Sequence, residues 1–308
     1  MSPSASDEPS VSVIVPTLNR SDLLTRAVDS VLGQDYSASI EVVVVFDGAS
    51  ADTSIERTSP RRALRALCTG GRTGPGPARN QGAAAATSQL IAFCDDDDVW
   101  LPHKLTAQVA ALRRESALAC FSGVLIHSRG ATITRIPRRA ELDPEHVIRT
   151  RVASAHLSTM VATREAWSTL VGGFDEHIPG SYGEDFDWLI RATRAGTVTA
   201  VEEPLVEVWW ADDSFFSGKW QMIVDALGYL TDKHAELRAD RVALARVLGQ
   251  QAFALAGLGR RTDARHMAVK ALRANPREMR GILALAAASG LVRAETILAL
   301  VKRTGRGI

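Results

Sequence analysis

Four consecutive aspartates, Asp95 to Asp98, follow directly on a short apolar run, Leu90 to Cys94. Such a run is typical of a buried strand in an α/β sheet. Adjacent carboxylates repel one another and gain stability when a cation or ligand donors neutralise them. Carboxylates, together with substrate phosphates, are ligands that Mg²⁺ and Mn²⁺ prefer. The sequence therefore favours a divalent cation site at a strand end, with a solvated acidic loop that caps the next helix as the alternative.

Two further apolar runs, Val11 to Val15 and Glu41 to Phe46, have the β-branched composition of parallel strands covered on both faces. Between them, apolar residues recur at a helical period over Ser21 to Leu32, with Ser21 or Asn19 available as the N-cap. This order predicts a βαβ unit, and a helix-like segment from Ala78 to Thr87 precedes the aspartate run in the same way. Ligands bind outside the carboxyl ends of such strands, where the aspartates also lie.

The rest of the chain has two kinds of sequence. Strands are expected at 118–126, 131–136 and 157–162, and helices at about 163–170 and 184–195. From about residue 216, Ala, Leu, Arg and Gly dominate, and apolar residues have helical spacing over 220–238, 240–258, 261–274 and 277–303. One stretch of this region resembles a tetratricopeptide-type helix pair, although a convincing array needs at least about three units.

These patterns predict the division of the chain. We expect a disordered tail over 1–9, an α/β domain with a mainly parallel sheet over 10–215 and a small all-α domain over 216–308. A chain of 308 residues is long enough for each domain to bury a core.

Charge and cysteine content narrow the class of protein further. The chain carries 36 Lys and Arg against 35 Asp and Glu, a formal net charge of +1, so no basic face for nucleic acid is expected. The cysteines, Cys68, Cys94 and Cys120, form no CxxC pair and are expected to be buried apolar residues in a reducing compartment. The polar start lacks the pattern of a signal peptide, and charged residues break the most apolar stretch, Gly281 to Leu300. We expect a cytoplasmic protein that does not span a membrane.

Six segments, in order along the chain, together resemble the motifs of family 2 glycosyltransferases. They are Val11 to Arg20, Val43 to Ser50, Ala78 to Asn80, Ile91 to Leu105, Gly172 to Glu176 and Gly183 to Arg191. Each motif alone is modest, but their order makes the resemblance specific, and it covers residues 11 to about 210. The resemblance implies a GT-A fold, a Rossmann-like α/β architecture, and transfer of a sugar from a nucleoside diphosphate.

The first two motifs would bind the nucleotide. By resemblance, Pro16, Thr17, Asn19 and Arg20 line it, with Thr17 offering its backbone and hydroxyl to the base. Asp47 matches an aspartate that accepts a hydrogen bond from the base, commonly uracil. The alternatives are a strand exit with a helix cap for the first segment and a plain Asp-Gly turn for the second.

Two arginines are further candidates for the donor site. Arg72 and Arg79 suit phosphate or uracil contacts, because a guanidinium binds planar or anionic groups through fixed paired donors. Arg79 opens a helix, so a salt bridge to the aspartates is an equal alternative.

The aspartate run acquires individual roles from the resemblance. Asp97 would bind Mn²⁺ or Mg²⁺ most directly with Asp95 assisting, Asp96 would reach the ribose hydroxyls, and Asp98 would cap the following helix. The cation would bridge the two phosphates and stabilise the leaving nucleoside diphosphate.

An inverting transfer needs one base that deprotonates the acceptor. Asp185 matches the proposed base of the family, and Glu184 beside it would orient the acceptor. Trp188 follows at i+3 on the same helix surface. The alternative is that both acids simply favour the N-terminus of a helix.

The chain departs from many family members in one respect. The stretch from Val206 to Phe216 has no His where an Arg-x-His group closes on the phosphates. Trp209 and Trp210, with Trp100 nearer the aspartates, are candidates for a lid or a wall of the acceptor site, while hinge packing is the alternative. His156 is interpreted as a core histidine.

These features predict an enzyme that moves a sugar from a nucleoside diphosphate, with a UDP-linked donor expected, to an acceptor hydroxyl of a glycan, a lipid-linked sugar, a small molecule or a peptide. The helical domain would shape the acceptor site, form a homodimer or rest on the inner face of the membrane. One alternative is a peptide-modifying transferase that glycosylates Cys or Ser, with the helices binding the peptide. A second is a nucleotide-sugar-binding scaffold without turnover.

Overall fold

The computed structural model describes residues 8–18, 20–71, 73–128, 131–152, 154–210, 218–290 and 292–303, and the structural statements below concern these residues. The chain forms two compact units. Unit 1 comprises Met1–Val147, Val152–Glu176 and Glu184–Trp210, and unit 2 comprises Ile148–Arg151, His177–Gly183 and Ala211–Ile308. Two short segments from within 10–215 therefore belong to unit 2. The tail expected over 1–9 lies mostly outside the described residues.

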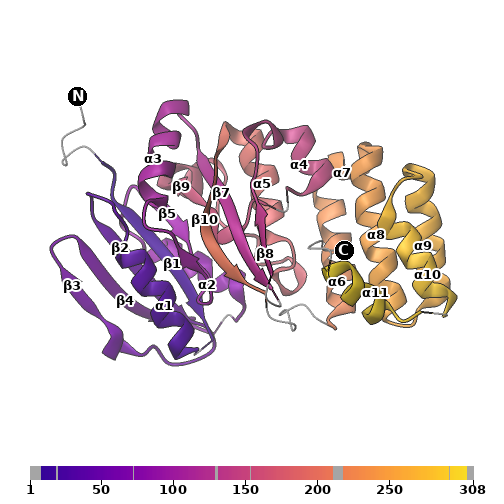
Figure 1. Ribbon diagram of the computed structural model, residues 1–308, viewed down its shortest axis with the longest axis horizontal. Coiled ribbons are helices and arrows are strands. Elements are labelled where there is room, and N and C mark those ends of the chain that lie inside the picture. Colours follow the sequence, from indigo (N-terminus) through magenta and orange to yellow (C-terminus); the bar gives the residue numbers. More distant parts are fainter. Residues whose placement is uncertain are drawn as a thin grey trace. The chain divides into compact units, whose positions relative to one another are not determined.

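Unit 1 is built around one mixed sheet of ten described strands (Figure 1). The order is β3-β4-β2-β1-β5-β9-β7-β10-β6, and β8 pairs with β7. The strands are β1 (Val11–Thr17), β2 (Ile40–Phe46), β3 (Arg57–Ser59), β4 (Arg62–Cys68), β5 (Leu90–Phe93), β6 (Val99–Trp100), β7 (Ala119–Ser128), β8 (Ala131–Arg135), β9 (Val161–Thr163) and β10 (Val198–Trp209). Strands β4, β2, β1 and β5 are parallel neighbours, whereas β9 runs antiparallel to both β5 and β7.

Helices cover both faces of this sheet. They are α1 (Ser21–Leu32), α2 (Pro75–Ala85), α3 (Lys104–Glu115) and α5 (Glu184–Ala195), and α4 (Pro144–Thr150) ends in unit 2. Val13 of β1 shares a core cluster with Leu24 of α1, whereas the next residue, Ile14, faces Gly82 of α2. Successive side chains of a strand point to opposite faces, so α1 and α2 lie on opposite sides of β1. This α/β layering is the predicted one.

Unit 2 is all-helical in its described part. It contains α6 (Trp220–Lys233), α7 (Ala235–Ala239), α8 (Arg241–Gly257), α9 (Arg261–Ala274), α10 (Met279–Ser289) and α11 (Ala294–Arg303). Ala252, Ala268 and Ala284 are fully buried beside Phe253, and such small side chains let the helices α8, α9 and α10 approach closely. Among the described helices, none combines the length and the apolar character that crossing a bilayer requires.

Most expected elements are confirmed, with α1, α5 and α9 at the expected bounds. Several details are wrong. The expected strand over 157–162 is a 3₁₀ turn, Leu157–Thr159, followed by β9, and the expected helix over 163–170 is a π-helical turn, Ala166–Leu170. The segment 277–303 forms two helices, because Gly290 ends α10 in the left-handed conformation.

Two local predictions also need correction. The N-cap of α1 is Arg20, which makes no side-chain capping bond, while Ser21 is already helical and Asn19 lies outside the described residues. Cys94 and Cys120 are buried as expected, but Cys68 is exposed, because it ends β4 beside a surface loop.

Candidate functional site

The topology brings distant segments to the carboxyl end of β5. The aspartate run leaves β5 there, immediately beside the end of the parallel strand β1. Strand β9 is antiparallel to β5, so it is the segment preceding β9, not the one following it, that lies at this edge. That segment carries His156 and Ser158. Backbone topology alone therefore places these two side chains next to the aspartates.

Asp96 and Asp97 are held by the end of β1 and the loop after it. The Thr17 hydroxyl donates to Asp96 Oδ2 at 2.6 Å, and Arg20 Nη2 lies 2.5 Å from Asp96 Oδ1. Arg20 Nη1 also lies 3.0 Å from Asp97, whose side chain is 37% exposed. The Asp96 side chain is 1% exposed and both its oxygens accept these bonds, and the ribose contact expected for Asp96 stays a prediction.

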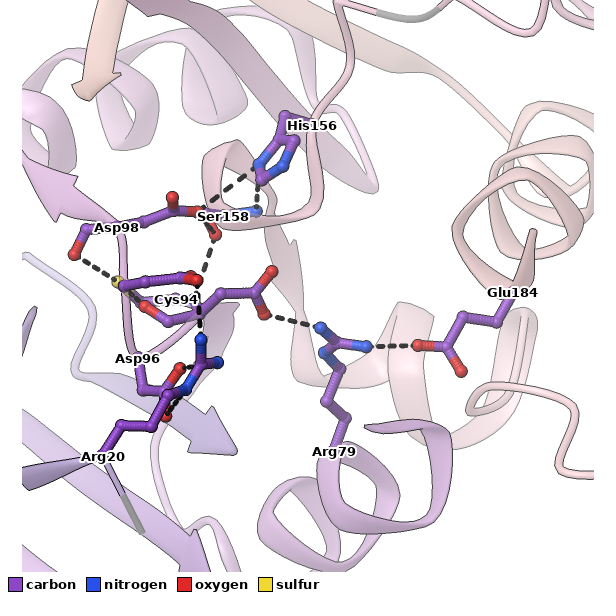
Figure 2. A network of polar contacts seen from close by, with 10 residues as sticks. Arg20, Arg79, Cys94, Asp96, Asp98, His156, Ser158 and Glu184 are labelled. Atoms are coloured by element: carbon purple, nitrogen blue, oxygen red, sulfur yellow. Dashed lines mark hydrogen bonds and ion pairs between the residues drawn. The ribbon is translucent and has the colours of Figure 1, made fainter. Parts of the chain in front are cut away.

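Arg79 connects the aspartate run to the start of α5. Its guanidinium donates to Asp95 Oδ1 at 2.5 Å and to Glu184 Oε1, and all three side chains come from unit 1 (Figure 2). Burial alone would lower the pKa of Arg79, but the two carboxylates outweigh it and raise this pKa. Burial would raise the pKa of Asp95, yet Arg79 lowers it. Of the two alternatives for Arg79, the structure contains the salt bridge.

Asp98 lies against His156 and Ser158. The Ser158 hydroxyl donates to Asp98 Oδ2 at 2.5 Å and accepts from the Asp95 backbone N–H at 3.0 Å, while His156 Nδ1 lies 3.7 Å from Asp98 Oδ2. Figure 2 shows the imidazole directed toward Asp98 and Ser158. Asp98 does not cap the next helix as expected, because α3 begins only at Lys104, with His103 as its N-cap.

Electrostatics around this pair follow from burial. Burial and the neighbouring Asp95 raise the pKa of the Asp98 carboxyl well above its usual range. Burial also lowers the pKa of His156, although Asp95 and Asp185 act in the opposite direction. Both shifts favour the neutral forms of the two groups.

The two acids expected to act on the acceptor open helix α5. Glu184 is 3% exposed and accepts from Arg79. Asp185 is half-buried, accepts from the Phe186 backbone N–H at 2.8 Å through Oδ1, and lies close enough to His156 to influence its pKa. The buried Glu184 therefore fixes the helix start, and Asp185 is the more open carboxylate of the two.

The expected nucleotide residues lie around the ends of β1 and β2. Pro16 is within β1, and Asp47 follows β2, where its Oδ2 accepts from the Gly74 backbone N–H at 2.8 Å and its Oδ1 from Thr69 at 3.3 Å. Asp47 thereby ties the loop after β4 to β2. Two other candidates, Asn19 and Arg72, lie outside the described residues.

The four tryptophans considered as acceptor or lid residues differ in their exposure. Trp100 and Trp188 are 2% and 1% exposed, so neither can form an acceptor surface; Trp188 instead donates to the Gly172 carbonyl at 2.9 Å. Trp209 is 38% exposed, stacks on His127 with ring centroids 5.0 Å apart, and has the Arg26 guanidinium 4.5 Å from its ring centroid. Trp210 lies 4.7 Å from the guanidinium of Arg135.

One group of side chains has the chemistry of a metal site. Asp95, Asp98 and His156 each offer a ligand atom, and these atoms all lie within 4.8 Å of one another. Carboxylate oxygens with one imidazole nitrogen suit Mn²⁺ and similar divalent ions. The residues present thus fit a divalent cation. The sequence interpretation took His156 for a core histidine, whereas its side chain is 31% exposed beside Asp98, and it missed Ser158.

The fold and the order of these residues agree with one protein family. The profile of glycosyl transferase family 2 matches residues 12–166. The chain belongs to glycosyl transferase family 2, as its motifs indicated. Among solved structures, S. aureus TarS in complex with UDP-GlcNAc has a TM-score of 0.61 at 16% identity. The match covers 91% of this chain and 92% of the TarS chain.

A second solved structure has the same fold. The mannosyltransferase PcManGT from Pyrobaculum calidifontis, in complex with GDP-Man and Mn²⁺, has a TM-score of 0.54 at 22% identity over 96% of this chain and 85% of its own. At these identities the likeness concerns the fold, which is the expected GT-A fold.

Curated relatives match the N-terminal region. Succinoglycan biosynthesis protein ExoO from Rhizobium meliloti is 32% identical over 46% of this chain and 41% of its own. GalNAc(5)-diNAcBac-PP-undecaprenol beta-1,3-glucosyltransferase from Campylobacter jejuni is 32% identical over 40% of each chain. An uncharacterized glycosyltransferase from Nostoc sp. is 36% identical over 38% of this chain and 36% of its own. The chain thus spans about two fifths of the length of these relatives.

Proposed function

We propose that this protein is a metal-dependent inverting glycosyltransferase that moves a sugar from a nucleoside diphosphate donor to an acceptor hydroxyl. The observation that carries the proposal is the ion-paired chain from Asp95 through Arg79 to Glu184, which joins the aspartate run to the helix that carries Asp185. Donor-binding and base-bearing elements are thereby held together in one unit.

Each group has a role in this proposal. Asp47, Pro16, Thr17 and Arg20 border the nucleotide. When bound at the aspartate run, where the family resemblance assigns Asp97 and Asp95, a divalent cation supplies positive charge to the two phosphates. Arg79 holds Asp95 in position through its ion pair.

The proposed reaction is a single displacement. The acceptor oxygen forms a bond to the anomeric carbon while Asp185 takes its proton, and the bond from that carbon to the phosphate oxygen breaks on the opposite face. The electron pair of that bond leaves with the nucleoside diphosphate. Glu184, paired to Arg79, keeps the first turn of α5 in place, so that Asp185 presents the accepting oxygen.

The donor is proposed to be UDP-linked. Two relatives from Escherichia coli are named as using UDP-Glc, and TarS is in complex with UDP-GlcNAc, whereas PcManGT holds GDP-Man. Three relatives are named for acceptors linked to diphosphoundecaprenol, which supports a lipid-linked glycan as the first acceptor to test.

Calorimetric binding of UDP, GDP and dTDP, with Mn²⁺ and again with EDTA, tests the donor site without an acceptor. We expect UDP to bind in Mn²⁺ and to lose most of its affinity in EDTA. Binding of none of the three nucleotides would contradict the proposal and favour a scaffold without turnover. Binding of GDP alone would retain the enzyme class and change the donor.

A further inference from the structure

We propose that His156 supplies a nitrogen ligand to the catalytic cation and that Asp95 and Asp98 bind the cation with it. This inference rests on the proposed function, because it concerns the metal of the same site. The resemblance assigned the cation to Asp97 and Asp95, and it did not count His156 or Asp98 among the metal ligands.

Positive charge is unevenly distributed around the five carboxylates of this site. Arg20 is shared by Asp96 and Asp97, and Arg79 is shared by Asp95 and Glu184. Within the described part of the chain, the only side chain of a basic residue in ion-pair range of Asp98 is the imidazole of His156. Two guanidiniums thus serve the other four carboxylates, and neither of them pairs with Asp98.

Because Asp98 is buried, a negative charge on it without a cationic partner would be unfavourable. The Asp98 side chain is 3% exposed, so water does not stabilise its anion. A divalent cation between Asp95 and Asp98 would supply the missing charge at the point where the protein supplies none. Asp97 differs, because its side chain is 37% exposed and already faces Arg20.

The geometry is nearly closed around one point. The ligand atoms of Asp95, Asp98 and His156 lie within 4.8 Å of one another. Atoms that bind one Mn²⁺-sized ion at about 2.1 Å are at most about 4.2 Å apart, so closure requires movements of only about half an ångström.

The surrounding contacts orient these ligands. Ser158 donates to Asp98 and accepts from the Asp95 backbone N–H, so one hydroxyl fixes both aspartates. His156 Nδ1 accepts from the Ser158 backbone N–H at 3.3 Å, so this nitrogen carries no proton, and a cation bound at Nδ1 would replace this long contact. Arg79 holds the side chain of the second carboxylate ligand, Asp95, through its ion pair. Ser158 is accordingly a positioning residue.

His156 also provides an imidazole in a chain whose sequence lacks the Arg-x-His group of many family members. The stretch after the base motif lacks the His that many family members carry. His156 reaches the aspartate run from a different element, the segment before β9. The site therefore has an imidazole without that motif.

Pulsed EPR of the full chain with Mn²⁺ and UDP tests this inference directly. Wild type is expected to show the ¹⁴N coupling of a directly bound imidazole, and His156→Gln is expected to lose it and to bind Mn²⁺ at least about 10-fold more weakly. His127→Gln is the matched control, because His127 is similarly exposed at 30% and also pairs with a carboxylate, Glu207, at 3.3 Å. The control should retain both the coupling and the affinity.

The remaining outcomes separate the two proposals. If UDP binds in a Mn²⁺-dependent manner but wild type shows no nitrogen coupling, this inference is wrong and the proposed function stands. If wild type binds neither Mn²⁺ nor UDP, both are wrong. Because the decisive spectrum is that of wild type, a variant that fails to fold does not prevent the test. Asp97→Asn is expected to retain the nitrogen coupling, whereas Asp98→Asn is expected to weaken Mn²⁺ binding.

Discussion

Arg79 and Glu184, which are 105 residues apart in the chain, form a buried ion pair that ties helix α2 to the first turn of α5. The same guanidinium also pairs with Asp95, so it has two carboxylate partners and a side chain that is 9% exposed. A buried charge that loses its partner is far less stable than an exposed one, and this sets the first prediction.

Replacing Arg79 with Met should destabilise the fold by about 3–5 kcal/mol, because Asp95 and Glu184 would be left without their shared cation. Arg57→Met is the control, since Arg57 pairs with Asp29 on the surface at 2.8 Å and both side chains are more than half exposed. That change should cost less than about 1 kcal/mol. The measurement is the urea midpoint of each variant, and equal losses would show that burial does not strengthen the Arg79 pairing.

Asp185→Asn should leave Mn²⁺-dependent UDP binding unchanged and lower transfer about 10²–10⁴-fold, because the amide cannot take the acceptor proton. Binding is measured by calorimetry and transfer by UDP release in the presence of an acceptor. Asp22→Asn removes an acid from the corresponding first turn of α1 and controls for the effect on a helix end. Full turnover by Asp185→Asn would mean that another group is the base.

Lys104 should make stability depend on pH in an unusual direction. Its Nζ is buried, lies 3.7 Å from the Trp100 ring centroid and has no hydrogen-bond partner among the described residues. Burial lowers the pKa of Lys104 from 10.5 to about 7. Between these values the unfolded chain holds a proton that the folded chain has released, so this residue makes the folded state more stable as pH rises.

The variant that tests this is Lys104→Met. Its stability advantage over wild type should be largest near or below pH 7 and should shrink by about 3 kcal/mol by about pH 9.5. Urea midpoints across this range provide the measurement, and Lys270→Met, at an exposed helix position, is the control. A pH-independent difference between wild type and Lys104→Met would be inconsistent with a depressed lysine pKa.

Gly82 should not tolerate even a methyl group. A Cβ there would lie 2.5 Å from Ile14 Cγ2 and 2.9 Å from Val45 Cγ2, so helix α2 would have to move away from the sheet. We expect Gly82→Ala to cost about 1–2 kcal/mol, despite the better helix propensity of alanine. Gly70→Ala is the control, because a Cβ there has nothing within 4 Å. Thermal melting of the two variants makes the comparison, and no loss at Gly82 would mean that this packing is loose.

The three thiols should differ in reactivity. Cys68 is exposed, whereas Cys94 and Cys120 are buried, and burial raises the pKa of Cys120 to about 11. One thiol should therefore react rapidly with a disulfide reagent in the folded protein, and the other two only on unfolding. Rapid loss of all three thiols would show that the core opens readily. Cys68→Ser should abolish the fast phase.

The sequence predicted those helices and strands whose apolar pattern matches the faces that they bury in the fold. The valine-rich strands β1 and β2 and the amphipathic α1 between them are one example, because burial on both faces leaves a continuous apolar run. Strand β4 was missed because arginines interrupt its apolar residues, and Arg62 and Arg65 find partners in backbone carbonyls and Glu41 instead of water. Such partners are not visible in local sequence.

The site was predictable in its motifs and not in its pairings. The aspartate run indicated an unusual concentration of negative charge. Which guanidinium pairs with which carboxylate depends on the fold. Glu184 and Arg79 illustrate this, since each looked like a ligand-binding residue and the structure pairs them with each other. Trp188 was expected at a surface because it shares a helix face with Asp185, yet Trp188 is 1% exposed whereas Asp185 is half-buried.

Strand β9 pairs antiparallel with β5, so the position of His156 depends more on the number of residues between it and β9 than on which residues these are. Register with β5 fixes Val161 opposite Ala92, so the chain from His156 to Val161 is a tether of set length. An inserted residue would displace the imidazole by up to about 3.5 Å, farther than a metal–ligand bond can stretch, whereas many substitutions inside the tether would leave the ring in reach. Among natural variants, the number of residues between His156 and Val161 should therefore vary less than their identities. A variant with a different number of residues in this segment should also have lost the histidine as a ligand.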